Sequence, residues 1–484
     1  MNVKNSIISF LTISLTIAVV FAGVSSCKKD KFSNDTSHKL SFSLDTLSFD
    51  TVFSEIGSST RIFKIYNPNN SKVKISSISL AGGASSFFRV NVNGLSSTNF
   101  KDVELRANDS IWVFIEVTID PNNNSNPILV MDSLVCVTNG NIQDVKLEAF
   151  GQDVYFHKPS DGDSSFELSC GEEWKSDKPH LVFGKALVDT NCQLNIAAGT
   201  KVFFHNDGAI EVLKGASLKV NGTKDSPVYF EGDRRESWYG DMAGQWIGII
   251  LSKESVDHEI NYLHLKNAQK GLECSAGVSL NSEALKLNNC SFLNCTAEGL
   301  HFINTKVKAY NLVVANCVGN ELLIEKGGSY SIIQGTIGNY VAQEAGATNA
   351  GNGVKITNWK MEDETAVNAD LSQCDFYNCI IYGSQSNEVV FDDNGAVFIY
   401  NFYNSLMRIQ GGANSTSQYS NCVFNEAPQF EDESSGIFLL KAISPAVNLG
   451  DLNVIQVNGI ELEYDFKGEN RTISGNPDAG AYEL

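Results

Sequence analysis

Aromatic side chains that could stack on a sugar ring lie close together in one segment of the chain. Trp238 and Tyr239 lie in a glycine-flanked insertion at residues 231–244, and Trp246 follows directly after it. Exposed tryptophan and tyrosine rings combine an apolar face with a polar edge, which suits the face of a sugar ring. The sequence therefore indicates a carbohydrate-binding site here. The alternative is that Trp246 belongs to the core and Trp238 covers its side.

Acidic residues that could bind a cation occur in two short runs. Asp392 and Asp393 precede an Asn-Gly pair, and a second run covers residues 362–364. Carboxylate and amide oxygens are the ligands that Ca²⁺ prefers. Asp392 and Asp393 are therefore the candidate ligands of Ca²⁺, the only cofactor that the sequence suggests. The simpler interpretation is a tight turn for the first run and a solvated loop for the second.

Residues for acid–base catalysis are not singled out by any motif. β-Elimination from a uronan needs an Arg or Lys base, and from residue 166 onward the arginines are Arg234, Arg235, Arg408 and Arg471. None of them lies in a motif that marks a base. His301 lies in an expected strand, where we expect an outward polar side chain. Inverting hydrolysis needs two carboxylates about 6.5–9.5 Å apart, and the sequence does not identify such a pair. We therefore assign no catalytic residue.

The cysteines suggest buried thiols and one disulfide. Ten cysteines follow Cys27, with no C-x-x-C pair and no Cys/His grouping of zinc-like spacing. Most of them recur at matching positions of the repeat described below, so we expect stacked, buried thiols. An exported chain can also oxidise its cysteines. Cys170 and Cys192 are the candidate disulfide pair.

The N-terminus indicates export and a lipid anchor. A positively charged start and an apolar stretch at residues 7–22 lead to Val24-Ser25-Ser26-Cys27. This pattern predicts a signal peptide at residues 1–26, and its end resembles the lipobox of bacterial lipoproteins, with Val24 in place of the usual Leu. The resemblance implies lipidation of Cys27, a tether at 27–39, and an outer-membrane lipoprotein whose partner is the lipid bilayer. The alternative is an ordinary signal peptide with an incidental cysteine.

Length and charge limit the possible partners. The chain has 484 residues, enough for two domains, with 36 Lys+Arg against 56 Asp+Glu and a net charge of −20. Such a surface repels nucleic acid and anionic lipid, so we expect no nucleic-acid partner. The same charge disfavours polyuronate substrates unless cations bridge the two.

Residues 40–154 show the alternation of a half-buried antiparallel sheet. Clear runs of period two lie at 61–66, 73–80 and 110–117, each bounded by turn residues. About seven such strands in a segment of this length are typical of an immunoglobulin-like β-sandwich. The order of these strands resembles the ASH-type, MSP-like immunoglobulin family. That resemblance implies a spacer or binding module rather than a catalytic domain.

Residues 155–484 carry a measurable repeat. The segment 289–295 aligns with 311–317 at a shift of 22 residues and with 334–340 at a shift of 23, and 373–379 matches once more. A period of this length, with several short strands and no helical pattern, predicts a parallel β-helix. Asparagine tolerates the left-handed backbone of a tight turn and can form ladders along a stack. The asparagines expected in one column are Asn267, Asn294, Asn316, Asn339 and Asn378.

Both ends of this region resemble a known family. The pattern L-x-I-x-A-G-T-x-V-x-F at 194–204, followed by G-T-x-x-x-P-V-x-F at 222–230, is similar to the opening rungs of pectate-lyase-like proteins. Residues from about 440 to 484 resemble the closing module of exported β-helix proteins. The resemblance implies a right-handed parallel β-helix. The expected fold class is therefore all-β, an immunoglobulin-like β-sandwich followed by a right-handed parallel β-helix.

These observations support a non-catalytic, lipid-anchored envelope protein whose β-helix presents a lateral face to a carbohydrate or another surface partner. The alternative is a polysaccharide lyase or glycoside hydrolase on the same fold. A third possibility is a structural or adhesive rod. Clustered carboxylates beside an Arg or Lys on the lateral face would favour an enzyme, and a flat Asn/Ser/Thr face would favour binding.

Overall fold

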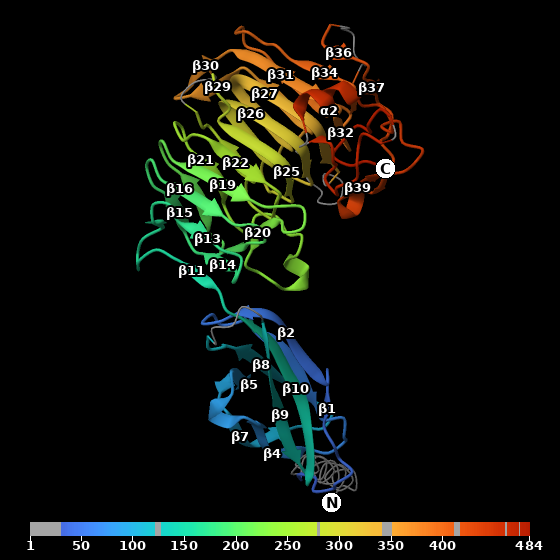
Figure 1. The fold of residues 1–484 in the computed structure, drawn as a ribbon. Helices are drawn as coiled ribbons and strands as arrows, with labels where there is room; N and C mark the ends of the chain where they lie inside the picture. The colour runs from blue at the N-terminus through green and yellow to red at the C-terminus, as the bar shows by residue number, and fades with distance from the viewer. Residues whose placement is uncertain are drawn as a thin grey trace, which may run out of the picture. The chain divides into compact units, whose positions relative to one another are not determined.

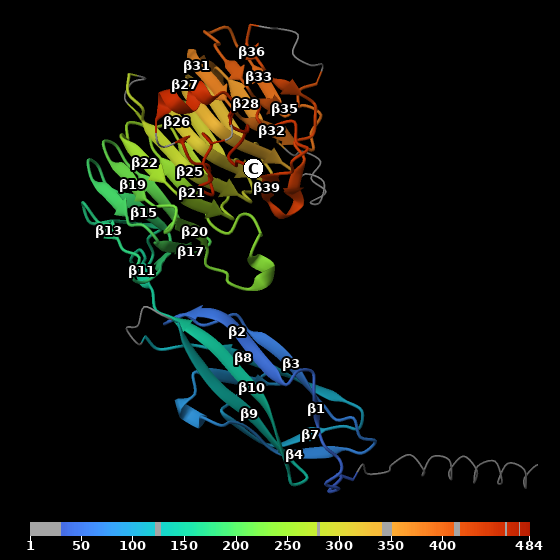
Figure 2. The same cartoon turned by 45° about the vertical axis from the view of Figure 1, so that its right-hand side comes forward.

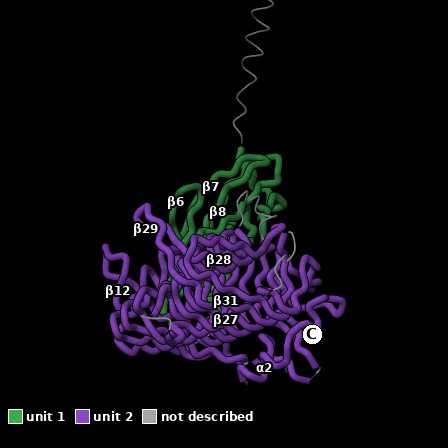
Figure 3. Tube along the Cα trace, turned by 90° about the horizontal axis from the view of Figure 1, so that it is seen from above, with its two compact units in different colours: residues 1–153 green, residues 154–484 purple. Residues whose placement is uncertain are grey.

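The computed structural model describes residues 31–121, 127–277, 281–340, 351–410, 417–459, 462–473 and 475–484. The chain divides into two compact units, Met1–Asp153 and Val154–Leu484, coloured separately in Figure 3. Both are built almost entirely from β-strands (Figure 1). The signal peptide predicted at 1–26 and the predicted lipid-bearing Cys27 lie outside the described residues. Among the residues that are described, no helix is both long and apolar enough to cross a bilayer.

The first unit is an immunoglobulin-like sandwich of two five-stranded sheets (Figure 2). Its core consists of the inward residues of each alternating strand, such as Phe63 and Ile65 in one sheet and Val145 and Leu147 in the other. The first sheet has the order β1 (Ser41–Phe42), β3 (Arg61–Tyr66), β8 (Ser110–Val117), β5 (Phe88–Val92), β6 (Leu95–Ser96). The second has the order β2 (Thr46–Phe53), β10 (Asn141–Gln152), β9 (Ile128–Thr138), β4 (Val73–Leu80), β7 (Asn99–Leu105).

The second unit is a right-handed parallel β-helix, in which each strand pairs in parallel with the strand one coil later. Three sheets therefore run along it. Sheet 1 contains β11 (Tyr155–His157), β14 (His180–Val182), β17 (Lys201–Phe204), β20 (Val228–Gly232), β23 (Leu263–Lys266), the ends of β25 (Leu285–Leu293), β26 (Leu300–Ala315) and β27 (Leu322–Asn339), then β32 (Ile380–Gly383), β35 (Leu406–Met407) and β37 (Val423–Phe424).

Sheets 2 and 3 complete each coil. Sheet 2 contains β12 (Ser165–Glu167), β15 (Lys185–Val188), β18 (Ala209–Val212), β21 (Gly248–Leu251), β24 (Leu272–Cys274), the starts of β26 and β27, β28 (Val354–Thr357) and β33 (Val389–Asp392). Sheet 3 contains β13 (Glu173–Trp174), β16 (Gln193–Ile196), β19 (Ser217–Asn221), β22 (His258–Asn261), the start of β25, the middles of β26 and β27, β31 (Leu371–Tyr377), β34 (Asn401–Tyr403) and β36 (Tyr419–Ser420).

The length of a coil varies more than the sequence repeat suggested. Phe292 pairs with Val314 at a step of 22 residues, and Val314 pairs with Ile337 at a step of 23, as predicted. However, Ile337 pairs with Ile381 at a step of 44. The longer coil contains a hairpin, β29 (Trp359–Glu362) and β30 (Thr365–Asn368), which projects without breaking the stack.

The asparagines form two columns at two corners, not one. Asn267, Asn294 and Asn316 share the corner after sheet 1, with φ angles of 66°, 57° and 63°. Asn378 was expected in this column, but the 44-residue coil places it above Gln334 at the corner between sheets 3 and 1. The second column, with left-handed backbone throughout, comprises Asn289, Asn311, Gln334, Asn378, Asn404 and Asn421.

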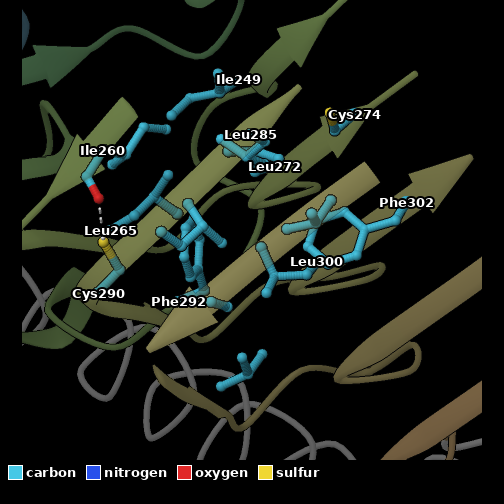
Figure 4. Packing of buried hydrophobic residues seen from close by; sticks show 14 of the residues in the cluster. Ile249, Ile260, Leu265, Leu272, Cys274, Leu285, Cys290, Phe292, Leu300 and Phe302 are labelled. Carbon is cyan, nitrogen blue, oxygen red and sulfur yellow. Dashed lines mark hydrogen bonds between the residues drawn. The ribbon is translucent and has the colours of Figure 1, made fainter. Parts of the chain in front are cut away.

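The interior of the β-helix is a stack of aliphatic, aromatic and thiol side chains. Figure 4 shows inward residues of successive coils in contact, including Leu265, Leu285 and Phe292, with the Cys290 thiol donating a hydrogen bond to the Ile260 carbonyl at 3.3 Å. Burial raises the pKa of Cys290 to about 12, so this thiol stays protonated and behaves as a small apolar group. A disulfide joins Cys170 to Cys192, 22 residues later in the chain.

The C-terminal segment closes the β-helix by packing on its outside. It contains β38 (Phe430–Asp432), β39 (Ile437–Leu440) and the short helix α2 (Leu452–Asn458). Arg471 is fully buried there, where its guanidinium donates to Asn311 at 3.1 Å and pairs with Glu483 at 3.3 Å. The closing module is thereby tied directly to an asparagine column.

Candidate functional site

Of the two tryptophans in and just after the insertion, one is exposed and the other is buried. Trp246 is fully buried and stacks on Phe204 at 4.0 Å between ring centroids, while its indole N–H donates to the Lys266 carbonyl at 3.0 Å. It is therefore a core residue, which corrects its assignment as a binding candidate. Trp238, in the single turn η2 (Ser237–Tyr239), is 58% exposed. Tyr239 lies beside it, under the guanidinium of Arg234 at 4.1 Å.

Next to this insertion lies a pocket of about 470 Å³ on the outer surface of sheet 1, called the Tyr229 pocket here. Strands β17, β20 and β23 form its floor, and the insertion contributes Arg235 to its rim. It is lined by Lys201, Phe203, Tyr229, Phe230, Glu231, Arg235, His264, Leu265, Lys266, Ser291 and Leu293.

The floor of the Tyr229 pocket is aromatic because alternate residues of its strands face outward. Along β20, Val228 and Phe230 are buried in the core, so Tyr229 and Glu231 point out. The register pairs Tyr229 with His264 on the next coil, and their rings stack at 5.3 Å. The Tyr229 ring remains 39% exposed, which leaves one face for a ligand.

The rim of the Tyr229 pocket carries charges that are partly used by the protein itself. Glu231 pairs with Arg235 at 2.6 Å and with Lys266 at 3.3 Å. His264 lies within hydrogen-bonding distance of the Ser291 hydroxyl at 2.8 Å, and burial lowers the pKa of this histidine. Lys201 lines the pocket and makes no ion pair within the described part of the chain. The pocket thus combines an aromatic floor with hydrogen-bond donors.

Two carboxylates lie at the C-terminal end of β20. Glu231 points outward from β20, and Asp233 follows directly after the strand ends at Gly232. Asp233 pairs with His205 at 2.7 Å, and Glu231 pairs with two cations. A glycosidase needs one carboxyl group to act as a proton donor. Both carboxylates are instead engaged in ion pairs.

A larger charged cluster lies on the outer surface of sheet 2, called the His301 cluster here. His301 lies between two carboxylates, with Glu273 at 3.4 Å from Nδ1 and Glu325 at 3.0 Å from Nε2. Lys270 pairs with Glu273 at 2.5 Å, and Lys360 pairs with Glu325 at 3.1 Å. Both ring nitrogens of His301 are therefore occupied.

The charged side chains of the His301 cluster pair with one another. Burial alone would lower the pKa of His301, but hydrogen bonds to Glu273 and Glu325 outweigh burial and raise it. The hydrogen bond from His301, together with Lys270, lowers the pKa of Glu273 to about 2 against the opposing effect of burial. His301 points outward as expected, yet it is only 6% exposed because the surrounding side chains cover it. The arrangement is that of a structural ion network.

The acidic residues predicted to bind Ca²⁺ form hydrogen bonds with neighbouring side chains. Asp392 accepts a hydrogen bond from the Trp359 indole at 3.1 Å, and Asp393 accepts from the Asn358 amide at 2.6 Å. Residues 362–364 lie at the tip of the β29–β30 hairpin. Across the described residues, no group of three or more His, Cys, Asp or Glu side chains is arranged to hold a metal ion. Ca²⁺ binding at Asp392 and Asp393 stays a prediction.

The sequence did not identify Tyr229, His264 or Lys201 as site residues. Each was visible as the outward residue of an alternating strand, for example in Leu263-His264-Leu265. What brings Tyr229 and His264 together is a register step of 35 residues. That step differs from the measured period, because the insertion lengthens this coil.

No protein-family model and no curated protein matches the chain. Similar solved structures include the catalytic unit of thermostable GH87 alpha-1,3-glucanase from Streptomyces thermodiastaticus, at 10% identity and a TM-score of 0.25, covering 75% of this chain and 87% of that one. An ASH/PapD-like domain of human CEP192 matches at 12% identity and a TM-score of 0.18, covering 26% of this chain and 92% of that domain.

A family 123 glycoside hydrolase from Clostridium perfringens matches at 10% identity and a TM-score of 0.17, covering 23% of this chain and 26% of that hydrolase. The match thus spans about a quarter of that enzyme. At these TM-scores the comparisons carry no functional argument, and the fold assignment rests on the strand pairing.

Proposed function

We propose that this protein is a non-catalytic carbohydrate-binding lipoprotein of the bacterial cell envelope, with the Tyr229 pocket as its binding site. The observation that carries the proposal is the Tyr229 ring, stacked on His264 yet 39% exposed within a pocket of about 470 Å³. Lys201 and Lys266 at the rim supply donors for hydroxyl groups, and the ring supplies an apolar face. This combination of stacking surface and polar rim suits a sugar.

The binding test compares variants of the full chain against an oligosaccharide array, followed by calorimetry on the strongest ligand. Tyr229→Ala removes the stacking surface and should weaken binding about tenfold or more. Tyr229→Phe keeps the ring and should retain most of the affinity. The matched control is Tyr155→Ala, which removes a similarly exposed tyrosine from β11 on the same sheet. Equal affinity of wild type and Tyr229→Ala for every ligand would remove the pocket from consideration.

Anchoring through Cys27 is tested separately from glycan binding. Cys27→Ser should release the protein from membranes, because the acyl chains are attached through the thiol. The measurement is partitioning between the membrane and soluble fractions. Equal partitioning of Cys27→Ser and wild type would refute the anchor and leave the binding proposal unaffected.

A glycoside hydrolase is the second candidate function, because Glu231 lines the Tyr229 pocket, Asp233 follows it two residues later, and a glycosidase uses two carboxyl groups. Turnover of a polysaccharide that disappears in both Glu231→Gln and Asp233→Asn would establish it and overturn the non-catalytic assignment. Turnover that survives both substitutions but disappears in Glu325→Gln would instead locate catalysis in the His301 cluster.

A further inference from the structure

A second pocket lies on the outer surface of sheet 3, where the closing module begins to cover the β-helix. Its volume is about 430 Å³, and it is called the Lys306 pocket here. Strands β26, β27 and β31 form its floor and α2 forms one wall. The polar residues that line it include Glu283, Lys306, Lys308, Ser329, Ser331 and Gln373.

Lysines gather at this pocket in a chain that is strongly acidic overall. Lys306 and Lys308 are alternate residues of β26, so both point outward, about 6.6 Å apart along the strand. The register places Lys286 of the preceding coil directly beside Lys308. Like charges on neighbouring strands repel each other and destabilise a sheet. Folding alone therefore does not account for three adjacent lysines here.

The described residues do not neutralise these lysines. Within the described part of the chain, none of the three makes an ion pair, and both Lys306 and Lys308 are only partly exposed. Glu283 lines the same pocket without reaching either ammonium at ion-pair distance. Asp375, two coils further along, accepts hydrogen bonds from Gln373 at 2.7 Å and from Asn401 at 2.8 Å. The Lys308 ammonium lies over the Tyr310 ring, 5.0 Å from its centroid. Among the described residues no carboxylate neutralises the pocket, so its positive charge is open to an anionic ligand.

One wall of the pocket offers a surface for the rest of that ligand. Tyr377 lines the pocket, and its ring stacks on Tyr403 of the next coil with centroids 4.7 Å apart. The Ser331 hydroxyl lies on the floor and makes no hydrogen bond to a described side chain. An ammonium is a compact point charge that suits a tetrahedral oxyanion, whereas planar carboxylates are matched better by the fork of arginine.

We propose that the Lys306 pocket binds a sulfate or phosphate ester carried on a sugar, with the ester between Lys306 and Lys308 and the sugar ring against Tyr377. This site lies on another sheet from the Tyr229 pocket and is independent of the proposed function. A sulfated and a phosphorylated sugar present the same tetrahedral anion, so the experiment includes both.

The experiment is calorimetry on the full chain with kappa-carrageenan tetrasaccharide, its desulfated form, glucose 6-sulfate and glucose 6-phosphate. The sulfated tetrasaccharide should bind at least about tenfold more tightly than the desulfated form. The double variant K306Q/K308Q should lose this difference, whereas K201Q, which alters the Tyr229 pocket, should keep it. The two monosaccharides decide whether the sulfate or the phosphate ester is preferred.

Three outcomes overturn the proposal. They are equal binding of the sulfated and desulfated tetrasaccharides, loss of binding in K201Q rather than in K306Q/K308Q, and no binding of any of the four probes. An unchanged melting temperature of K306Q/K308Q, within about 2 °C of wild type, shows that the variant is folded. If it is not, the single variant K308Q is measured in its place.

Discussion

The His301 cluster and the Tyr229 pocket are built from the same residue types on two sheets of one β-helix, yet they differ in what they leave unused. In the His301 cluster both imidazole nitrogens, Glu273 and Glu325 are occupied by one another and by lysines. In the Tyr229 pocket an aromatic face and Lys201 remain available. If the Tyr229 pocket is the binding site, as proposed, the comparison teaches that the density of charged residues does not mark such a site. Unused bonding capacity beside an exposed ring marks it better.

His301 in the cluster and His264 in the pocket differ in the same way as the two sites do. Against the opposing effect of burial, the hydrogen bonds that His301 donates to Glu273 and Glu325 raise its pKa, so its charged form is part of the network. Burial lowers the pKa of His264, so its neutral form supports the Tyr229 ring. His301 therefore acts as a cation between two carboxylates, whereas His264 acts as a neutral ring that stacks on Tyr229. The following predictions test this distinction, beginning with the largest expected effect.

Removing the support beneath the Tyr229 pocket should have the largest effect. Trp246 is fully buried against Phe204 and Phe230, and Phe230 lines the pocket floor. Trp246→Ala should lower the free energy of unfolding by about 3–5 kcal/mol, because it leaves a large cavity. Urea denaturation measures the change. A loss below about 1 kcal/mol would mean that the core collapses around the site.

Breaking the His301 cluster should reduce stability without affecting a glycan ligand. His301→Leu removes the group that separates Glu273 from Glu325 and leaves two carboxylates facing each other. We expect a loss of about 2–3 kcal/mol, below the range for a fully buried pair because the two glutamates are partly exposed. Affinity of the Tyr229 pocket should not change. Loss of binding in His301→Leu with little loss of stability would make the cluster functional.

Much of the fold could be predicted from the sequence, because it depends on local patterns. The period-two strands of the first unit and the 22- and 23-residue steps around Phe292 and Val314 appear directly in the chain. The placement of Asn378 failed for a physical reason. A coil can carry a long excursion between two corners, so a matching motif alone does not fix which column a residue joins.

The sites were harder to predict than the fold. Tyr229 meets His264 across a step of 35 residues, and Lys286 meets Lys308 across a step of 22. Each pairing depends on the register of the stack, which a single strand does not reveal. Trp246 shows the converse problem, because a tryptophan in a glycine-rich segment suits either a core or a surface until its neighbours are known.

The pH dependence of stability should have opposite signs for the two histidines. His301, with a raised pKa, contributes stability that is fully present below the unfolded value of about 6.5 and is lost as pH rises through its folded pKa. His264, with a lowered pKa, loses its contribution as pH falls from about 6.5 toward its folded pKa. Urea denaturation of H301Q and H264Q between about pH 5 and pH 8 measures both contributions.

The stability of wild type relative to H301Q should increase as the pH falls through this range, and its stability relative to H264Q should decrease. Titration of the two imidazoles by NMR is the independent check, since it reports each pKa directly. If both histidines titrated in the same direction from the ordinary value, the proposed difference between a closed cluster and an open pocket would lose its electrostatic basis.

The smallest effect on stability is expected at Trp238, and it separates two designs of the binding site. Trp238 is 58% exposed on the insertion that supplies Arg235 to the pocket rim. Trp238→Ala should change the free energy of unfolding by no more than about 0.5 kcal/mol, because the side chain lies at the surface and more than half of it is exposed. If a bound oligosaccharide extends from Tyr229 onto the insertion, the same variant should weaken a long oligosaccharide by about fivefold and leave a monosaccharide unaffected. Calorimetry with ligands of increasing length distinguishes this from a pocket confined to Tyr229, for which Trp238→Ala would change no affinity at any length.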